Sequence, residues 1–145
     1  MRVIIIDSLI GNDYTINLCK GLQQVVKDLT LILPKNRKIE PLANVRVKLW
    51  APSKDSGVNK VRKSADYIHF LFRLFILIRL GRKCIVHFQF FRRKFDIYFL
   101  VFLRLLGIKL VYTAHNVLPH ETKSFDRFRA NLLYRAAGAI IVHSN

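Results

Sequence analysis

The run Val111–Glu121, which reads VYTAHNVLPHE, contains the side chains best suited to chemistry in this sequence. It places His115, Asn116, His120 and Glu121 directly after an apolar stretch, in a segment that also contains a proline. An imidazole in such a segment can hydrogen-bond a hydroxyl group and accept its proton near neutral pH. The run is therefore a candidate site for a substrate that carries hydroxyl groups.

A metal centre is a weaker interpretation of the same run. His115, His120 and Glu121 could ligate a metal, but their spacing matches no zinc-protease helix motif. Pro119 also prevents the helix that would place two histidines on one face. We therefore expect no metal. Cys19 and Cys84 lie inside apolar runs without a paired spacing, which favours buried thiols in a reducing cytosol over a disulfide or a zinc site.

A second candidate site follows the first apolar run of the chain. Gly11 and Asn12 stand in the turn between that run and a helix beginning near Asp13, and the free N–H groups of a helix N-terminus favour an anion. The turn is thus a candidate contact for phosphate or for a sugar hydroxyl. An ordinary glycine turn with an Asn or Asp cap explains the same residues equally well.

A third candidate follows the apolar run near residue 85. Gln89 and the cluster Arg92, Arg93 and Lys94 could meet a phosphate or an acidic headgroup, although a solvated loop would have the same composition. We interpret His87, which lies within the apolar run, as a core histidine.

The elements that would position these residues alternate along the chain. Continuous apolar runs such as VIII, LTLIL and CIVHF are typical of strands buried on both faces of a parallel sheet. The alternation predicts an α/β fold: a Rossmann-like, mostly parallel open sheet of about six strands flanked by helices. The expected strands are 2–7, 29–34, 45–50, 84–90, 109–115 and 139–144, and the expected helices are 13–27, 59–80, 96–106 and 124–137.

Two local features refine this prediction. Gly81, Gly107 and Gly138 each follow the last periodic residue of a predicted helix, which is typical of a helix stop. Residues 35–44 are too few and too polar for a crossover helix, so we expect the second and third strands to form an edge hairpin.

Positive charge is the most pronounced feature of the composition. The chain carries 25 Lys and Arg against nine Asp and Glu, and nine of its sixteen net positive charges lie in residues 54–94. Such an excess does not favour folding, because like charges repel in a compact state. It indicates a polyanionic partner: nucleic acid, acidic lipid or a phosphorylated substrate.

The apolar stretches Tyr67–Leu80 and Ile97–Leu106 favour a membrane surface over nucleic acid. Both are shorter than the roughly 20 apolar residues that span a bilayer, and arginines interrupt or end them. They suit an interfacial helix instead, although they would also serve to cover the sheet. No zinc-finger spacing or aromatic RNA-binding motif is present, so nucleic acid is the less favoured partner. The candidate anion-binding residues are Lys60, Arg62, Lys63, Arg73, Arg79, Arg82, Lys83, Arg92, Arg93 and Lys94.

The C-terminal part of the chain, residues 111–145, resembles the N-terminal domain of family 4 glycosyltransferases. The resemblance rests on YTAHNVLPHE, on a helix ending in YRAAG and on the strand AIIVHSN. The family commonly shows a T-x-H-[DN] turn after its fifth strand and a later hydrophobic–V–H/S–S strand. The order of elements is similar from Met1 to Asn145, but the specific part is residues 111–145.

The resemblance implies a GT-B fold, in which two Rossmann-like domains face each other across a cleft. The N-terminal domain of that fold mostly binds the acceptor, and the C-terminal domain holds the UDP- or GDP-sugar donor. Carried over by position, His115 is the candidate catalytic residue, and Gly11 and Asn12 would approach the donor phosphates. The candidate acceptor-binding residues are Asn116, His120, Glu121 and Gln89.

The sequence departs from the family pattern in two ways. Its first loop has a single glycine, Gly11, where many members have two. The donor-binding domain is missing, so we expect residues 1–145 to be one truncated acceptor-side domain that is inactive alone. The implied function is polysaccharide or glycolipid assembly at the cytoplasmic face of a bacterial membrane. The alternative is a non-catalytic membrane-docking subunit that works with a donor-binding partner chain.

Overall fold

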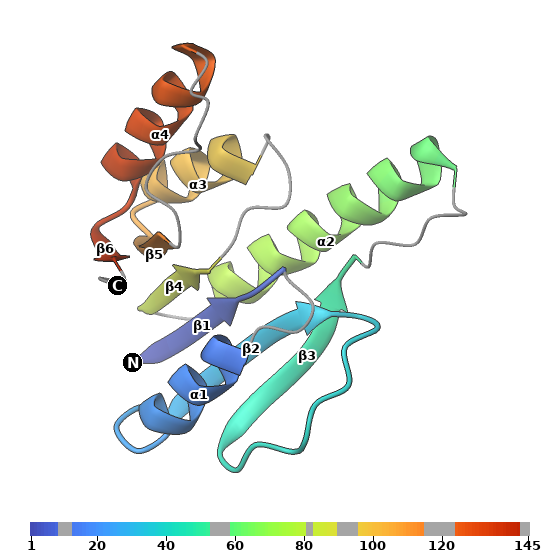
Figure 1. Cartoon of the computed structure of the whole chain (residues 1–145), viewed down its shortest axis with the longest axis vertical. Helices are drawn as coiled ribbons and strands as arrows, with labels where there is room; N and C mark the ends of the chain where they lie inside the picture. The colour runs from blue at the N-terminus through green and yellow to red at the C-terminus, as the bar shows by residue number, and fades with distance from the viewer. Residues whose placement is uncertain (9–12, 53–58, 81–82, 90–95, 115–123, 143–145) are drawn as a thin grey trace.

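The computed structural model describes residues 1–8, 13–52, 59–80, 83–89, 96–114 and 124–142. Within them, six strands form one open sheet in the order β3-β2-β1-β4-β5-β6, and every neighbouring pair is parallel. The sheet and its four helices are shown in Figure 1. The strands are β1 (Arg2–Ile6), β2 (Asp28–Pro34), β3 (Val45–Ala51), β4 (Cys84–Phe88), β5 (Lys109–Ala114) and β6 (Ala139–Val142), and the helices are α1 (Asp13–Leu22), α2 (Lys60–Leu80), α3 (Asp96–Leu105) and α4 (Ser124–Ala136). The predicted α/β class and the Rossmann-like parallel sheet are confirmed.

The two faces of the sheet are covered by different elements. Successive side chains of β1 lie on opposite faces of the sheet. Val3 and Ile5 belong to one apolar cluster, and Ile4 and Ile6 belong to the other. The first cluster is closed by Cys19 on α1, whereas the second is closed by α2, α3 and α4. The strands are thus sandwiched between α1 and the layer formed by α2, α3 and α4 (Figure 1).

The predicted edge hairpin is wrong, because β2 and β3 are parallel. The chain returns to the start of β3 without a helix, along residues 35–44. An extended segment of ten residues reaches about 33 Å, which exceeds the roughly 23 Å length of a seven-residue strand. Ile39 and Leu42 pack against the α1-side cluster, so the returning segment also covers this face of the sheet.

The glycine stop signals have different structural meanings. Gly107 has a φ of 77° and follows α3, where the amide of Gly107 bonds the Arg104 carbonyl and the amide of Ile108 bonds the Leu103 carbonyl. This is a Schellman end, as the sequence predicts. Gly138 has no positive φ, and its backbone amide donates a hydrogen bond to the Leu110 carbonyl of β5. Gly81 lies outside the described residues.

The helix boundaries agree with the prediction except at α1, which ends at Leu22 and not at Lys27. The first two turns of α2 contribute no buried residue to the core. The buried residues of this helix are Tyr67, Phe70, Leu74 and Ile78. In Figure 1 this end of α2 extends past the strands. No helix in the described part of the chain is long and apolar enough to cross a membrane.

Candidate functional site

The strand order places a topological switch point between β1 and β4. From β1 the chain proceeds outward to β2 and β3, and from β4 it proceeds in the opposite direction to β5 and β6. In open parallel sheets of this kind, ligands bind beyond the carboxyl ends of the strands at the switch point, because the connections diverge there. The residues at the carboxyl ends of β1, β4 and β5 are therefore the first candidates.

Asp7 follows β1 on the α1 side of the sheet and is fully buried. The Thr15 hydroxyl of α1 donates a hydrogen bond of 2.6 Å to its carboxylate. The Arg37 guanidinium lies 3.5 Å from the same carboxylate oxygen, and the Arg37 side chain is only 5% exposed. These contacts tie the end of β1 to α1 and to the segment after β2.

His87 lies on the same face, within β4. Its Nε2 atom is 2.8 Å from the Thr113 hydroxyl of β5 and 3.2 Å from the side-chain nitrogen of Gln89. The tautomer of the ring determines whether Nε2 donates or accepts in these contacts. All three side chains are buried. The interpretation of His87 as a hydrogen-bonded core histidine is confirmed.

The two groups of polar residues belong to one edge. The backbone amide of Gln89 donates a hydrogen bond to the Ile6 carbonyl. This bond extends the β1–β4 ladder by one residue and brings Gln89 beside Asp7. The α1 side of the switch point is thus lined by a row of buried, hydrogen-bonded polar side chains, which we call the polar row: Asp7, Thr15, Arg37, His87, Gln89 and Thr113. Burying polar groups is unfavourable unless they are paired, so the row is a fixed platform at this edge.

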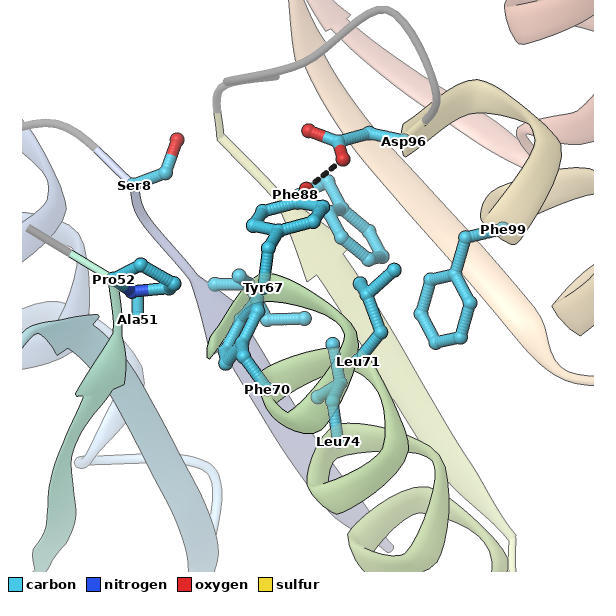
Figure 2. Close-up of a pocket in the computed structure, with 11 residues that line it drawn as sticks. Ser8, Ala51, Pro52, Tyr67, Phe70, Leu71, Leu74, Phe88, Asp96 and Phe99 are labelled. Atoms are coloured by element: carbon cyan, nitrogen blue, oxygen red, sulfur yellow. Dashed lines mark hydrogen bonds between the residues drawn. The ribbon is translucent and has the colours of Figure 1, made fainter. Parts of the chain in front are cut away.

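A small cavity lies at the same edge, on the opposite face of the sheet. Its volume is about 20 Å³, close to the space that one water molecule needs. Figure 2 shows its lining, in which side chains of α2 and α3 meet the ends of β1, β3 and β4. The Tyr67 hydroxyl donates to the buried Asp96 carboxylate in the first turn of α3. The cavity is too small for a sugar or a nucleotide, and the Tyr67–Asp96 contact at its rim links α2 to α3.

A polar groove of about 390 Å³ runs between α1 and the segment after β2. Asp13 and Lys20 line its α1 side, and Lys38 and Glu40 line the other. Arg37 also borders this groove, so the polar row and the groove are adjacent. Mixed charges of this kind suit a hydrophilic ligand, and the N-terminus of α1 opens onto the groove.

Most of the site residues predicted from the sequence lie outside the described residues. These are Gly11, Asn12, Arg82, Arg92, Arg93, Lys94, His115, Asn116, His120 and Glu121. Gln89, the remaining acceptor-binding candidate, belongs to the polar row and is fully buried. The sequence analysis missed Asp7, Thr15, Arg37, Tyr67 and Asp96. An acidic residue directly after a buried strand, as at Asp7, is the signal that could have identified the edge.

The basic residues predicted to meet anions are spread along α2. Lys60, Arg62, Arg73 and Arg79 are exposed, and Lys63 is half-buried. Lys83 is exposed at the start of β4, at the opposite edge from the polar row. The Arg73 guanidinium also stacks on the Trp50 ring of β3, 4.2 Å from its centroid. Lys48 lies over the same ring at 4.5 Å, so Trp50 fixes two cations near the edge of the sheet.

Both cysteines are free and buried, as the sequence predicts. Burial raises the pKa of the Cys19 thiol to about 12, and the nearby Asp7 carboxylate adds to the shift. Burial also raises the pKa of Cys84 and of the Tyr112 phenol. Because the thiolate is the reactive form, neither cysteine is suited to nucleophilic chemistry at neutral pH. Among the described residues, no group of three or more His, Cys, Asp and Glu is arranged to hold a metal.

Comparison with known proteins assigns no family to this arrangement. No known protein family matches the sequence. No curated protein is significantly similar to it either.

Proposed function

We propose that this chain is the acceptor-binding N-terminal domain of a glycosyltransferase that uses a nucleotide sugar, with a GT-B architecture. The observation that carries the proposal is the position of β5. This strand leads into the YTAHN run, and it stands directly beside β4 at the switch-point edge. Thr113, two residues before His115 in the chain, contacts His87 in the polar row.

The sheet order supports the proposal. A parallel sheet of order 3-2-1-4-5-6 has one crevice between its diverging connections, and nucleotides and sugars commonly bind at such a crevice. Fold alone does not determine function, so the proposal also rests on the sequence of residues 111–145. Residues 111–145, which resemble family 4 glycosyltransferases, include the end of β5 at the carboxyl edge of the sheet.

In the proposed function, the polar row positions the end of β1 and does not supply the catalytic group. The Asp7 carboxylate is committed to Thr15 and Arg37, and it is fully buried. Its contacts fix the end of β1 shortly before Gly11 and Asn12 in the chain, which lie outside the described residues. In the proposed enzyme, Gly11 and Asn12 would approach the donor phosphates.

The reacting group in this proposal is His115. Its imidazole would hydrogen-bond the acceptor hydroxyl and polarise it for attack on the sugar, with Asn116, His120 and Glu121 around the same acceptor. The UDP- or GDP-sugar would be held by a donor-binding domain, supplied by the same polypeptide or by a partner chain. The proposed setting is polysaccharide or glycolipid assembly at the inner face of a bacterial membrane.

The test is sugar transfer by the protein as it is encoded in its source. Membranes from cells that express it are incubated with radiolabelled UDP- and GDP-sugars, and label is measured in the lipid and glycan fractions. We expect incorporation that His115→Ala lowers by about 10²–10⁴-fold, the range that a positioned acid–base group contributes. His69→Ala, on exposed α2, is the matched control and should retain wild-type incorporation.

Two results would contradict the proposal. Absence of label with every donor would remove the transferase function, and equal activity of the two variants would remove His115 from the chemistry. In the first case, vesicle binding by the same protein would favour the non-catalytic docking subunit.

A further inference from the structure

The outward side of α2 and α3 carries apolar side chains that the core does not use. On α2, Ile68, Phe72 and Ile76 are spaced four residues apart and are 67%, 60% and 40% exposed. They lie on the side of the helix opposite to the buried Phe70, Leu74 and Ile78. A helix that only covered a sheet would carry polar side chains on this side.

Helix α3 continues the same surface. Tyr98 and Phe102 are each 46% exposed, and Leu105 is 80% exposed. The ring centroids of Phe75 on α2 and Phe102 on α3 are 5.7 Å apart, so the exposed apolar residues of the two helices form one surface. We call this surface the α2–α3 face; it consists of Ile68, Phe72, Ile76, Tyr98, Phe102 and Leu105. Single exposed apolar residues need no explanation, but a joined set on two helices indicates a binding surface.

Positive charge lies on both helices that form the α2–α3 face. Arg62, Arg73 and Arg79 on α2 and Arg104 on α3 are all exposed. Among the described residues of these two helices, Asp66 is the one exposed acidic side chain, since Asp96 is buried. A second copy of the chain would bring the same positive charges together, so a dimer through this face is electrostatically unfavourable. A partner with negative charge and an apolar interior fits both features.

We propose that the α2–α3 face docks onto an anionic lipid bilayer. Arg62 and Arg79 contact lipid phosphates, while the exposed apolar side chains enter the region between headgroups and acyl chains. Each basic side chain near an anionic leaflet strengthens binding about fivefold. Helix α2 then lies along the membrane surface, with the sheet behind it.

This docking mode fixes the orientation of the candidate site. The α2–α3–α4 layer faces the bilayer, and α1 with the polar groove faces away from it (Figure 1). The carboxyl edge of the sheet, with the switch point, opens sideways along the membrane. Membrane docking through α2 and α3 is independent of the proposed glycosyltransferase function.

The first experiment removes the apolar contacts. Binding is measured by co-sedimentation with phosphatidylcholine vesicles, with and without phosphatidylglycerol. We expect Phe72→Ser/Ile76→Ser to weaken binding to the anionic vesicles at least about tenfold, because two inserted side chains are lost. The control is Val25→Ser, which removes a side chain that is 79% exposed in the turn after α1, on the other face of the sheet.

The second experiment separates local charge from net charge. Arg62→Glu/Arg79→Glu should weaken vesicle binding by at least about 25-fold, from the loss of two basic contacts. Lys20→Glu/Lys27→Glu changes the net charge equally on the α1 side, where both lysines are exposed, and should have a small effect. Equal weakening by the two pairs would overturn the α2–α3 face as the docking surface.

The third experiment reports insertion directly. Trp50 is the single tryptophan of the chain, so Phe72→Trp in a Trp50→Phe background places one fluorophore on the face. We expect its emission to shift to the blue with anionic vesicles and to be quenched by brominated lipids. Unshifted emission in bound protein would overturn insertion, and equal binding to phosphatidylcholine alone would overturn the role of charge. Tight binding to DNA or RNA, unaffected by Phe72→Ser/Ile76→Ser and without vesicle binding, would assign the charge to nucleic acid instead.

Discussion

The Tyr67 hydroxyl on α2 donates a hydrogen bond to the Asp96 carboxylate in the first turn of α3, and both side chains are buried. This contact joins two residues 29 positions apart in the chain and links α2 to α3 at the edge of the sheet where the switch point is found. A carboxylate in the first turn also interacts favourably with the helix dipole of α3. The pair therefore holds together the helix layer that carries the α2–α3 face.

Tyr67→Phe removes this hydrogen bond without creating a large cavity. A bond to a charged group contributes about 1.5–3 kcal/mol, so we expect the free energy of unfolding to fall by that amount in urea. A double-mutant cycle with Asp96→Asn isolates the pair, and its coupling energy should exceed about 1 kcal/mol. Additive effects of the two substitutions would show that the contact contributes nothing of its own.

Thr15 tests the anchoring of Asp7 on the other face. Thr15→Val keeps the shape of the side chain but removes the donor to a fully buried carboxylate, so we expect a loss of about 1–3 kcal/mol in unfolding free energy. Thr15→Ser keeps the hydroxyl and is the matched control, which should retain most of the stability. The reverse order, with Ser less stable than Val, would mean that packing and not the hydrogen bond decides at this position.

The sequence predicts the sheet well because its strands are continuous apolar runs. Runs such as VIII and CIVHF leave no alternating polar face, and this pattern requires cover on both sides. The relative direction of β2 and β3 was mispredicted, because crossover segments were assumed to be helical. Residues 35–44 show that an extended segment of sufficient length serves equally, with Ile39 and Leu42 supplying its apolar contacts.

The contacts of the candidate site could not be predicted in the same way. The pairing of Asp7 with Arg37 joins residues 30 positions apart, and neither belongs to a local motif. Gln89 was expected to meet the acceptor because it follows a strand, whereas it is fully buried beside His87. The side of the sheet on which such a residue lies depends on the register of the strand and on the helix covering it. Helix α1 and the segment after β2 provide that cover here.

Alkaline pH should destabilise the fold through Cys19. Its folded pKa is raised to about 12, from about 9 in the unfolded chain, so the folded state keeps the proton longer. This contribution to stability is complete below pH 9 and is lost as the pH rises from about 9 to about 12, at about 1.4 kcal/mol per pH unit. Cys19→Ala lacks the titrating thiol, so its unfolding free energy should fall less steeply over this range in urea titrations at several pH values. Parallel curves for the two proteins would rule out the thiol as the cause.

Two glycines should respond to alanine in opposite directions. Gly107 has a φ of 77°, in the left-handed region that disfavours a Cβ atom, although space around it is open. Gly107→Ala should therefore lower the unfolding free energy by about 1–2 kcal/mol through backbone strain alone. Gly21 lies within α1, also with open space, so Gly21→Ala should raise it by up to about 1 kcal/mol. Thermal unfolding of both variants provides the comparison. Stabilisation by Gly107→Ala would contradict the Schellman end assigned to α3.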